Sequence, residues 1–326
     1  MCLLSLLFPV AACTSAADLK PTDPDPMALD ASPSVPAADL ASPTPDLTPV
    51  TPPPPARCTG LPMAAPGTTA RTMMSRGKAR TYFLHVPAKY DPSLPTELVF
   101  AFHGLGDKAD SFLQGIGIQS EADSRNLIVI APQGLGVVAG WNAGNCCGEP
   151  QLFKVDDVGF VSDMIDATRK ELCIDDKRIF AMGFSNGGMF AHRLACELAG
   201  TIAAIGPVSG TPMVKSCTPA RPISVLHMHG TADKVVGYNG GGTGTFPKVS
   251  DVIADWAGRD SCTGMPLETY KSGAVTCMSY RTCAEMSEVS LCTIEGGEHA
   301  WPGAGGATMD IKATPAILDF FVRHPR

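Results

Sequence analysis

Hydrophobic residues gather in short runs along the chain, and stretches of helical spacing separate these runs. The segments 97–104, 126–134 and 202–210 are almost continuously apolar, as is typical of strands buried on both faces of a parallel sheet. Between such runs, apolar residues recur every three or four positions, which predicts helices that cover the sheet. Strands that alternate with helices indicate an α/β fold with a mostly parallel, doubly wound sheet.

The same pattern predicts the order of elements. Strands are expected at 80–87, 97–104, 126–134, 177–184, 202–210, 222–230 and 288–295. Helices are expected at 111–124, 157–171, 187–199, 248–259 and 312–323. In sheets of this kind, functional groups lie at the carboxyl ends of the strands.

The sequence AMGFSNGGMF, residues 181–190, joins the end of a strand to the start of a helix. Gly183, Ser185 and Gly187 stand there in G-x-S-x-G order. The small residues let strand and helix approach closely, while Ser185 takes a strained turn conformation that exposes its hydroxyl. The same letters also fit an ordinary loop with an N-cap serine. The motif alone therefore leaves nucleophile and cap as alternatives.

Two further strand ends carry side chains that complete a catalytic set. Asp233 follows the strand at 222–230, and His299 follows the strand at 288–295. Taken singly, Asp233 fits a turn and His299 fits a surface loop. Together with Ser185 they have the chain order of the α/β-hydrolase triad, in which histidine activates the serine hydroxyl and aspartate orients the histidine. The conjunction predicts a nucleophilic serine with His299 as its base.

A developing oxyanion needs two N–H donors. Asn186, the residue after the nucleophile, is expected to supply one from the start of the helix. The second is expected from the loop after the strand at 97–104, at Leu105 or, failing that, Gly104. His103 is counted among the substrate-side residues and is expected to shape that loop.

Trp141 and Trp301 are candidates for substrate contact because both lie in loops near the predicted triad. Their rings would stack on a sugar or a phenolic acyl group, or cover a polyester chain. The alternative is that both rings pack inside and hold their loops in place. His227 and His229 are interpreted as strand residues with satisfied hydrogen bonds, not as ligands.

Composition narrows the class of protein. The 326 residues carry a formal charge of −7, which argues against a nucleic-acid partner because a phosphate backbone demands a clustered basic face. Apolar residues make up 44% of the chain, enough for a large core. We expect one α/β catalytic domain over residues 57–326, with no metal and no cofactor.

The first residues resemble a targeting segment. An apolar run ends in Val10-Ala11-Ala12-Cys13, which resembles the lipobox of bacterial lipoproteins, although no Lys or Arg precedes it. We expect residues 1–17 to be a signal region with Cys13 as the lipidated residue, and the membrane to be reached only through this lipid. The alternative is cleavage after Ala17 and free secretion. Residues 18–56 are rich in Pro, Ala, Asp, Ser and Thr, which predicts a disordered tether.

Cysteine usage favours an exported chain with disulfides. Ten of the 12 cysteines lie beyond the leader, and no recurring C-x-x-C pair supports zinc. The spacing suggests three pairs: Cys196–Cys217, Cys277–Cys283 and Cys262–Cys292. The adjacent Cys146 and Cys147 are expected to pair with distant partners, for which Cys58 and Cys173 are available.

The motifs HVPAKYDPSLPTELVFAFHG, WNAGNCCG, VDDVGF, GFSNGGM, HGTAD and IEGGEHAWPG resemble, in this order, those of exported esterases of the polyhydroxybutyrate depolymerase and feruloyl esterase type. The resemblance covers about residues 80–325. It implies an α/β-hydrolase fold and a metal-independent serine carboxylesterase with Ser185, Asp233 and His299 as triad. Some fungal relatives tie serine and histidine together through neighbouring cysteines; Phe184 and Ala300 stand at those positions here, so that arrangement is absent.

The expected substrate is an ester too large to import, with feruloyl or acetyl esters of plant polysaccharides favoured. A short-chain polyester such as poly(3-hydroxybutyrate) is the main alternative. A serine peptidase is less favoured because prolyl-peptidase relatives carry a large extra domain. A catalytically inactive surface-binding lipoprotein is disfavoured by the intact triad. The enzyme is expected at the cell surface or outside the cell.

Overall fold

The computed structural model describes residues 58–326. The predicted signal region at 1–17, with Cys13, and the predicted tether at 18–56 lie outside the described residues. None of the helices within the described part is long and apolar enough to cross a membrane.

The described residues fold around one ten-stranded sheet with the order β1-β2-β4-β3-β5-β6-β7-β10-β9-β8. Strands β4, β3, β5, β6, β7 and β10 run parallel, and antiparallel pairs flank them at both edges. The strands are β1 (Gly67–Ser75), β2 (Lys78–Val86), β3 (Thr96–Phe102), β4 (Ile128–Pro132), β5 (Ile174–Phe184), β6 (Ala204–Val208), β7 (Ser224–Gly230), β8 (Leu267–Ser272), β9 (Val275–Tyr280) and β10 (Val289–Ile294). The predicted mostly parallel α/β sheet is confirmed.

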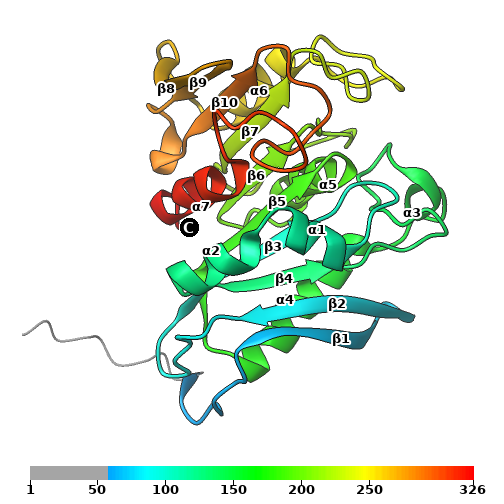
Figure 1. The fold of residues 1–326 in the computed structure, drawn as a ribbon, viewed down its shortest axis with the longest axis vertical. Coiled ribbons are helices and arrows are strands. Elements are labelled where there is room, and N and C mark those ends of the chain that lie inside the picture. Colours follow the sequence, from blue (N-terminus) through cyan, green and yellow to red (C-terminus); the bar gives the residue numbers. More distant parts are fainter. Residues whose placement is uncertain (1–57) are drawn as a thin grey trace, which may run out of the picture. The chain divides into compact units, whose positions relative to one another are not determined.

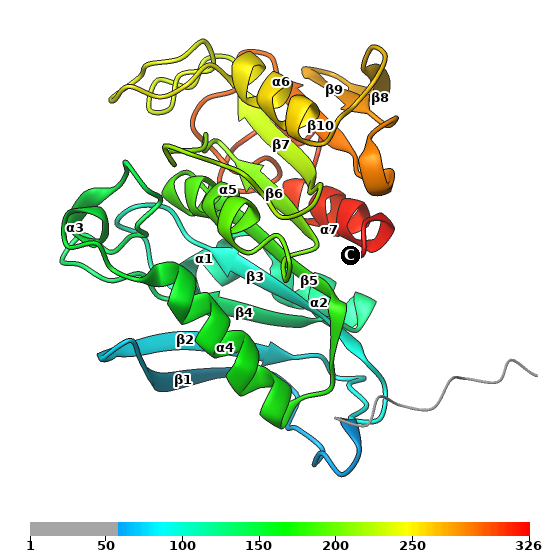
Figure 2. The same ribbon diagram turned by 180° about the vertical axis from the view of Figure 1, so that it is seen from behind.

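Helices cover both faces of this sheet. The helices are α1 (Ala109–Gly115), α2 (Ile118–Arg125), α3 (Gly148–Leu152), α4 (Asp157–Glu171), α5 (Asn186–Glu197), α6 (Val249–Arg259) and α7 (Ala313–Arg323). Figure 1 shows α1, α2 and α7 on one face, and Figure 2 shows α4, α5 and α6 on the other. Two separate groups of buried apolar side chains correspond to these faces, with Phe160, Phe190 and Trp256 in one and Phe112 and Phe320 in the other.

Several elements differ from those that the sequence pattern predicts. The single helix expected at 111–124 is two helices, because Gly117 between α1 and α2 takes a left-handed conformation with φ 64°. Strand β9 and the short helix α3 were not predicted, and neither were the edge strands β1 and β8. The residues of β1 and β8 are mostly half-buried or exposed, so these strands lack the continuous apolar runs of the central strands.

Five disulfides join all ten cysteines of the described part: Cys58–Cys173, Cys146–Cys147, Cys196–Cys217, Cys262–Cys283 and Cys277–Cys292. The predicted Cys196–Cys217 pair is confirmed. The other predicted pairs are wrong. The hairpin turn lies between β8 and β9, before Cys277, so that Cys277 is directly opposite Cys292 on β10. Cys146 and Cys147 pair with each other, which leaves Cys58 and Cys173 to form a bond of their own.

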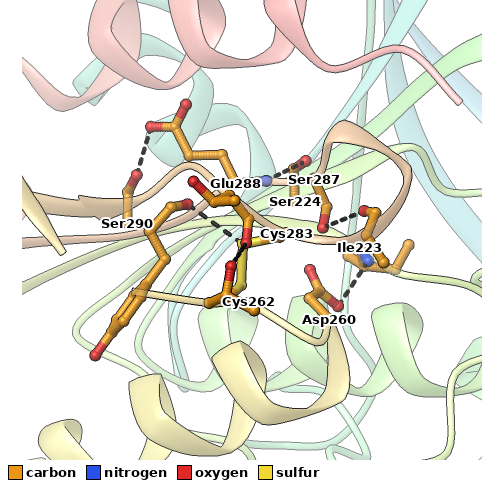
Figure 3. Close-up of a disulfide and its surroundings, with 12 residues drawn as sticks. Ile223, Ser224, Asp260, Cys262, Cys283, Ser287, Glu288 and Ser290 are labelled. Atoms are coloured by element: carbon orange, nitrogen blue, oxygen red, sulfur yellow. Dashed lines mark hydrogen bonds between the residues drawn. A yellow bond between two sulfur atoms is a disulfide. The ribbon is translucent and has the colours of Figure 1, made fainter. Parts of the chain in front are cut away.

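A buried polar cluster surrounds the Cys262–Cys283 disulfide at the start of β10 (Figure 3). Asp260 accepts a hydrogen bond from the Ile223 N–H at 3.1 Å, and burial raises the pKa of Asp260 to about 6. The Glu288 N–H donates to Ser224 Oγ at 3.1 Å, while Glu288 Oε1 accepts from Ser290 Oγ at 2.8 Å. These bonds tie the end of α6 to β7 and β10, the two strands that precede Asp233 and His299.

Glu288→Gln is expected to lower the free energy of unfolding at neutral pH, and to lower it by less in acid. Burial alone would raise the pKa of Glu288, but hydrogen bonds from His324 and Ser290 lower it to about 2. The stabilisation from the ionised carboxylate is present above the ordinary pKa of 4.5 and is lost as the pH falls toward 2. Urea unfolding at about pH 7 and about pH 3 measures the difference between the two proteins, which should shrink in acid.

The matched control is Glu285→Gln, because Glu285 is exposed in the same loop. It separates the effect of the buried hydrogen bonds from that of the substitution itself. A difference for Glu288→Gln that stays constant or grows in acid would contradict the assignment.

Candidate active site

Ser185 stands in a sharp turn between β5 and α5. Its φ of 53° and ψ of −119° lie in a region that side chains other than glycine rarely adopt. The Ser185 N–H donates to the Val208 carbonyl of β6 at 2.8 Å, which holds the turn against the neighbouring strand. A side-chain carbon at Gly187 would overlap the Phe102 carbonyl oxygen of β3, so only glycine fits there. The geometry is that of a nucleophile elbow.

Asp233 and His299 approach each other from the ends of β7 and β10. His299 Nδ1 lies 2.7 Å from Asp233 Oδ2. The other carboxylate oxygen, Oδ1, accepts the backbone N–H groups of Val235 and Val236, both at 2.9 Å. Burial alone would raise the pKa of Asp233, but hydrogen bonds from His229 and His299 hold it well below its usual range. Asp233 is therefore an ionised carboxylate aimed at the histidine.

Ser185 and His299 line the same cavity, which has a volume of about 470 Å³. The Phe184 and His299 ring centroids are 4.8 Å apart, which places the imidazole beside the residue that precedes the serine. The arrangement thus brings together the three residues predicted as a triad at the carboxyl ends of three parallel strands.

Leu105 and Asn186, the predicted donors to an oxyanion, also line this cavity. Within residues 58–326, neither backbone N–H donates a hydrogen bond to the protein. The Asn186 side chain is otherwise engaged, because it accepts from the Trp141 N–H at 2.7 Å and donates to the Trp141 carbonyl at 3.0 Å. Both free N–H groups are thus available beside Ser185.

His103 is fully buried and joins two loops of the site. Its Nδ1 lies 2.7 Å from the Gly104 carbonyl, so this nitrogen carries the proton. Its Nε2 accepts the Gly134 N–H at 3.0 Å. Burial lowers the pKa of His103, which keeps the ring neutral. His103 therefore holds the Leu105 loop through its backbone contacts. It is buried and does not line the cavity, which corrects its place among the substrate-side residues.

The two tryptophans face the interior, which corrects the expectation of substrate contact. Trp141 is completely buried, and its indole N–H donates to the His103 carbonyl at 3.0 Å. Trp301 is 6% exposed, packs edge-on against Phe112 and donates to Thr314 Oγ1 at 3.1 Å. Their loop positions were predicted correctly, but each indole N–H has a partner inside the protein, so the packing alternative holds.

Other side chains supply the apolar wall of the cavity. These are Leu105, Cys146, Cys147, Phe184, Met189, Val235, Val236 and Phe246. The Cys146–Cys147 disulfide was missed because its cysteines were assigned to distant partners, and Cys147 Sγ lies 3.9 Å from Met189 Sδ. Phe246 comes from the Gly-rich segment after β7, where no hydrophobic periodicity marks it. Residues 58–326 contain no group of three or more His, Cys, Asp or Glu side chains placed to hold a metal ion.

The chain is similar to known carboxylic ester hydrolases. The phospholipase/carboxylesterase family model matches residues 88–244. Feruloyl esterase B of Piromyces equi is 32% identical over 236 residues, which are 68% of this chain and 42% of that enzyme. The probable feruloyl esterase C of Aspergillus niger is 30% identical over 250 residues, which are 74% of this chain and 84% of that enzyme. The chain therefore spans less than half of the Piromyces protein but most of the Aspergillus one.

The fold has solved counterparts at low sequence identity. The acetyl xylan esterase from Aspergillus awamori superposes with a TM-score of 0.59 at 13% identity, over 78% of this chain and 99% of that one. At this identity the likeness concerns the fold alone.

Proposed function

Because the chain belongs to the feruloyl esterase family, we propose that it is a serine carboxylesterase that cleaves feruloyl or acetyl esters of polymeric substrates. Ser185 is the nucleophile, His299 the general base and acid, and Asp233 the residue that orients His299. The observation that carries this proposal is the 2.7 Å contact from His299 Nδ1 to Asp233 Oδ2, beside a cavity that also contains the strained Ser185.

The reaction follows from these positions in two halves. Ser185 Oγ attacks the ester carbonyl carbon while His299 Nε2 takes the hydroxyl proton, and the N–H groups of Leu105 and Asn186 stabilise the oxyanion. Collapse of the tetrahedral intermediate breaks the carbon–oxygen bond to the alcohol, which leaves with the proton from His299. Water then attacks the acyl-enzyme with His299 again as base, which releases the acid and restores Ser185.

The apolar wall supports an acyl group of aromatic character. Phe246, Met189 and the Cys146–Cys147 disulfide are positioned to cover a flat ring close to Ser185. Asp107 and Thr243 also line the cavity, and their polar groups suit the hydroxyls of a sugar on the alcohol side. A hydroxybutyrate oligomer is the second candidate, because an open apolar wall also accommodates short acyl repeats.

The five disulfides support a site of action outside the cytoplasm, since disulfides persist in oxidising compartments. We extend this to a lipid-anchored form that is held through Cys13, on the sequence pattern that precedes it. Two or more acyl chains on one cysteine give stable membrane attachment.

Ser185→Ala is expected to lower kcat/KM for p-nitrophenyl acetate on the order of 10⁶-fold, because no other hydroxyl stands at the elbow. His299→Ala should be similarly severe, and Asp233→Asn should cost about 10⁴-fold through the wrong histidine tautomer. Steady-state hydrolysis measures all three. Ser250→Ala, at an exposed serine of α6, is the control and should keep full activity. Hydrolysis by Ser185→Ala at the wild-type rate would end the proposal.

Phe246→Ala is expected to lower kcat/KM for methyl ferulate more than for p-nitrophenyl acetate. An aromatic contact of about 0.5–1.5 kcal/mol beyond area burial corresponds to a further loss of roughly threefold to tenfold. Phe153→Ala is the matched control, since Phe153 is 69% exposed and outside the cavity. Equal losses on both esters would contradict aromatic recognition. Rapid cleavage of hydroxybutyrate trimers without action on ferulate esters would favour the polyester.

Cys13→Ser is expected to move esterase activity from the membrane fraction to the soluble fraction of cells that process lipoproteins. The thiol is the only group at this position that accepts the lipid. Fractionation followed by an ester assay measures the shift, and Cys2→Ser serves as the control. Unchanged partitioning would favour free secretion and would leave the proposed chemistry untouched.

A further inference from the structure

Four buried side chains lead from helix α6 to Asp233. Trp256 Nε1 on α6 donates to His192 Nδ1 on α5 at 3.0 Å. The His192 and His227 ring centroids are 5.6 Å apart, and His227 Nε2 lies 3.0 Å from His229 Nδ1. His229 Nε2 lies 3.3 Å from Asp233 Oδ2. All three histidines have no exposed surface, and the proposed mechanism uses none of them.

The partners of His229 fix the position of its proton. Its Nε2 faces two acceptors, the Val236 carbonyl oxygen at 2.7 Å and the Asp233 carboxylate, so Nε2 carries a hydrogen. Its Nδ1 faces His227 Nε2. Burial lowers the pKa of His227 well below its ordinary value, so His227 is neutral and donates this one hydrogen to His229 Nδ1.

At the far end of the chain, the indole of Trp256 only donates, so His192 Nδ1 accepts. Burial lowers the pKa of His192 to about 3, which keeps this ring neutral as well. His192 packs against His227 without a hydrogen bond between the two rings, so His227 alone contacts His229 Nδ1 and leaves His229 Nε2 to face the carboxylate.

Asp233 accepts three N–H hydrogen bonds, and His229 Nε2, whose hydrogen is shared with the Val236 carbonyl, lies 3.3 Å from its Oδ2. Val235 and Val236 donate to Oδ1, while His299 and His229 both approach Oδ2. A carboxylate held on both oxygens has one orientation, and its charge is shared between two imidazoles. Removal of the His229 hydrogen would leave a more basic Oδ2, which then keeps His299 as its single hydrogen-bond donor.

Other titratable groups surround this arrangement. The Tyr238 ring stands edge-on to His229 at 5.9 Å, and its hydroxyl is paired with Thr293 Oγ1 at 2.8 Å. His229 and His299 both line a second cavity of about 490 Å³, together with the carboxyl groups of Glu295 and Glu298. Glu295, Glu298 and the neighbouring Lys234 are exposed, so their charges are screened by water.

We propose that His229 is a positioning residue of the hydrolase, which acts through Asp233 by donating a second imidazole hydrogen bond to the carboxylate that orients His299. The inference rests on the proposed triad. It assigns to His227 the task of holding His229 in the tautomer that donates, while Trp256 and His192 pack against the His227 ring from α6 and α5.

The test compares His229→Leu with His229→Gln, whose side-chain amide places an N–H donor where Nε2 stands. His229→Leu should lower kcat for p-nitrophenyl acetate on the order of 10- to 100-fold, with KM little changed, because His229 does not touch the substrate. In the pH profile of kcat/KM, the acidic limb of His229→Leu should move to higher pH by about half a unit or more, since the more basic carboxylate stabilises protonated His299. His229→Gln should restore the position of the limb and most of kcat.

A purely structural role would lower the thermal stability of both variants and leave the acidic limb in place, and that result would overturn the proposal. Ser185→Ala is measured alongside. If it retains activity, the proposed function fails; if it is inactive while His229→Leu keeps the wild-type kcat and pH profile, only the inference about His229 fails.

A second readout does not depend on the folding of His229→Leu. Low-field proton NMR of ¹⁵N-histidine-labelled wild-type protein should show protons on both His299 Nδ1 and His229 Nε2, and both should shift in Asp233→Asn. An unprotonated His229 Nε2, or a His229 proton whose chemical shift does not change in Asp233→Asn, would refute the proposed hydrogen bond.

Discussion

The close approach of helix α5 to strand β3 is the constraint on which the site depends. Gly187 leaves room for the Phe102 carbonyl oxygen at the point where the chain reverses after β5. With this contact in place, the chain turns at Ser185 with a positive φ. The Ser185 N–H donates to the Val208 carbonyl of β6, which holds the turn. The strain of that turn, typically 1–3 kcal/mol, is offset by the packing of three parallel strands around it. The same approach leaves the Asn186 N–H free at the start of the helix.

The loops around the serine are joined to one another by buried hydrogen bonds from side chain to backbone. Asn186 pairs with both backbone groups of Trp141, the Trp141 indole reaches the His103 carbonyl, and the His103 ring holds Gly134. The buried ion pair of Arg80 and Asp157, at 2.8 Å, extends this network, because the second carboxylate oxygen accepts the Asn142 N–H. Buried polar groups that are fully paired select one loop arrangement over others, since any slip leaves an unsatisfied donor or acceptor in the interior.

The central strands, and the strand ends at which Ser185, Asp233 and His299 stand, were predictable from the sequence because they follow from local signals. Continuous apolar runs mark β3, β4 and β6, and α4 matches its predicted range of 157–171. The residues predicted as a triad follow β5, β7 and β10, so their convergence at one edge is a property of the parallel sheet. The direction in which a side chain points is not set by local sequence. Trp141 and Trp301 lie in the expected loops, but their rings point inward because their indole N–H groups bind partners elsewhere in the sequence. These partners are the His103 carbonyl and the Thr314 hydroxyl. The prediction of disulfide partners failed for the same reason. The register between β9 and β10 places Cys277 opposite Cys292, and this register is not a local property of the sequence.

The apolar wall of the cavity links substrate recognition to the redox state of the compartment in which the protein acts. In the Cys146–Cys147 disulfide, two thiols that would each prefer a hydrogen-bond partner become one apolar, polarizable surface beside Met189 and Leu105. In a reducing compartment the same residues would present two S–H groups to the substrate, and the loop that carries them would lose a covalent constraint. The other four disulfides form under oxidising conditions, and the same conditions form the disulfide part of this wall. The folded enzyme and its complete apolar binding surface therefore arise under the same condition.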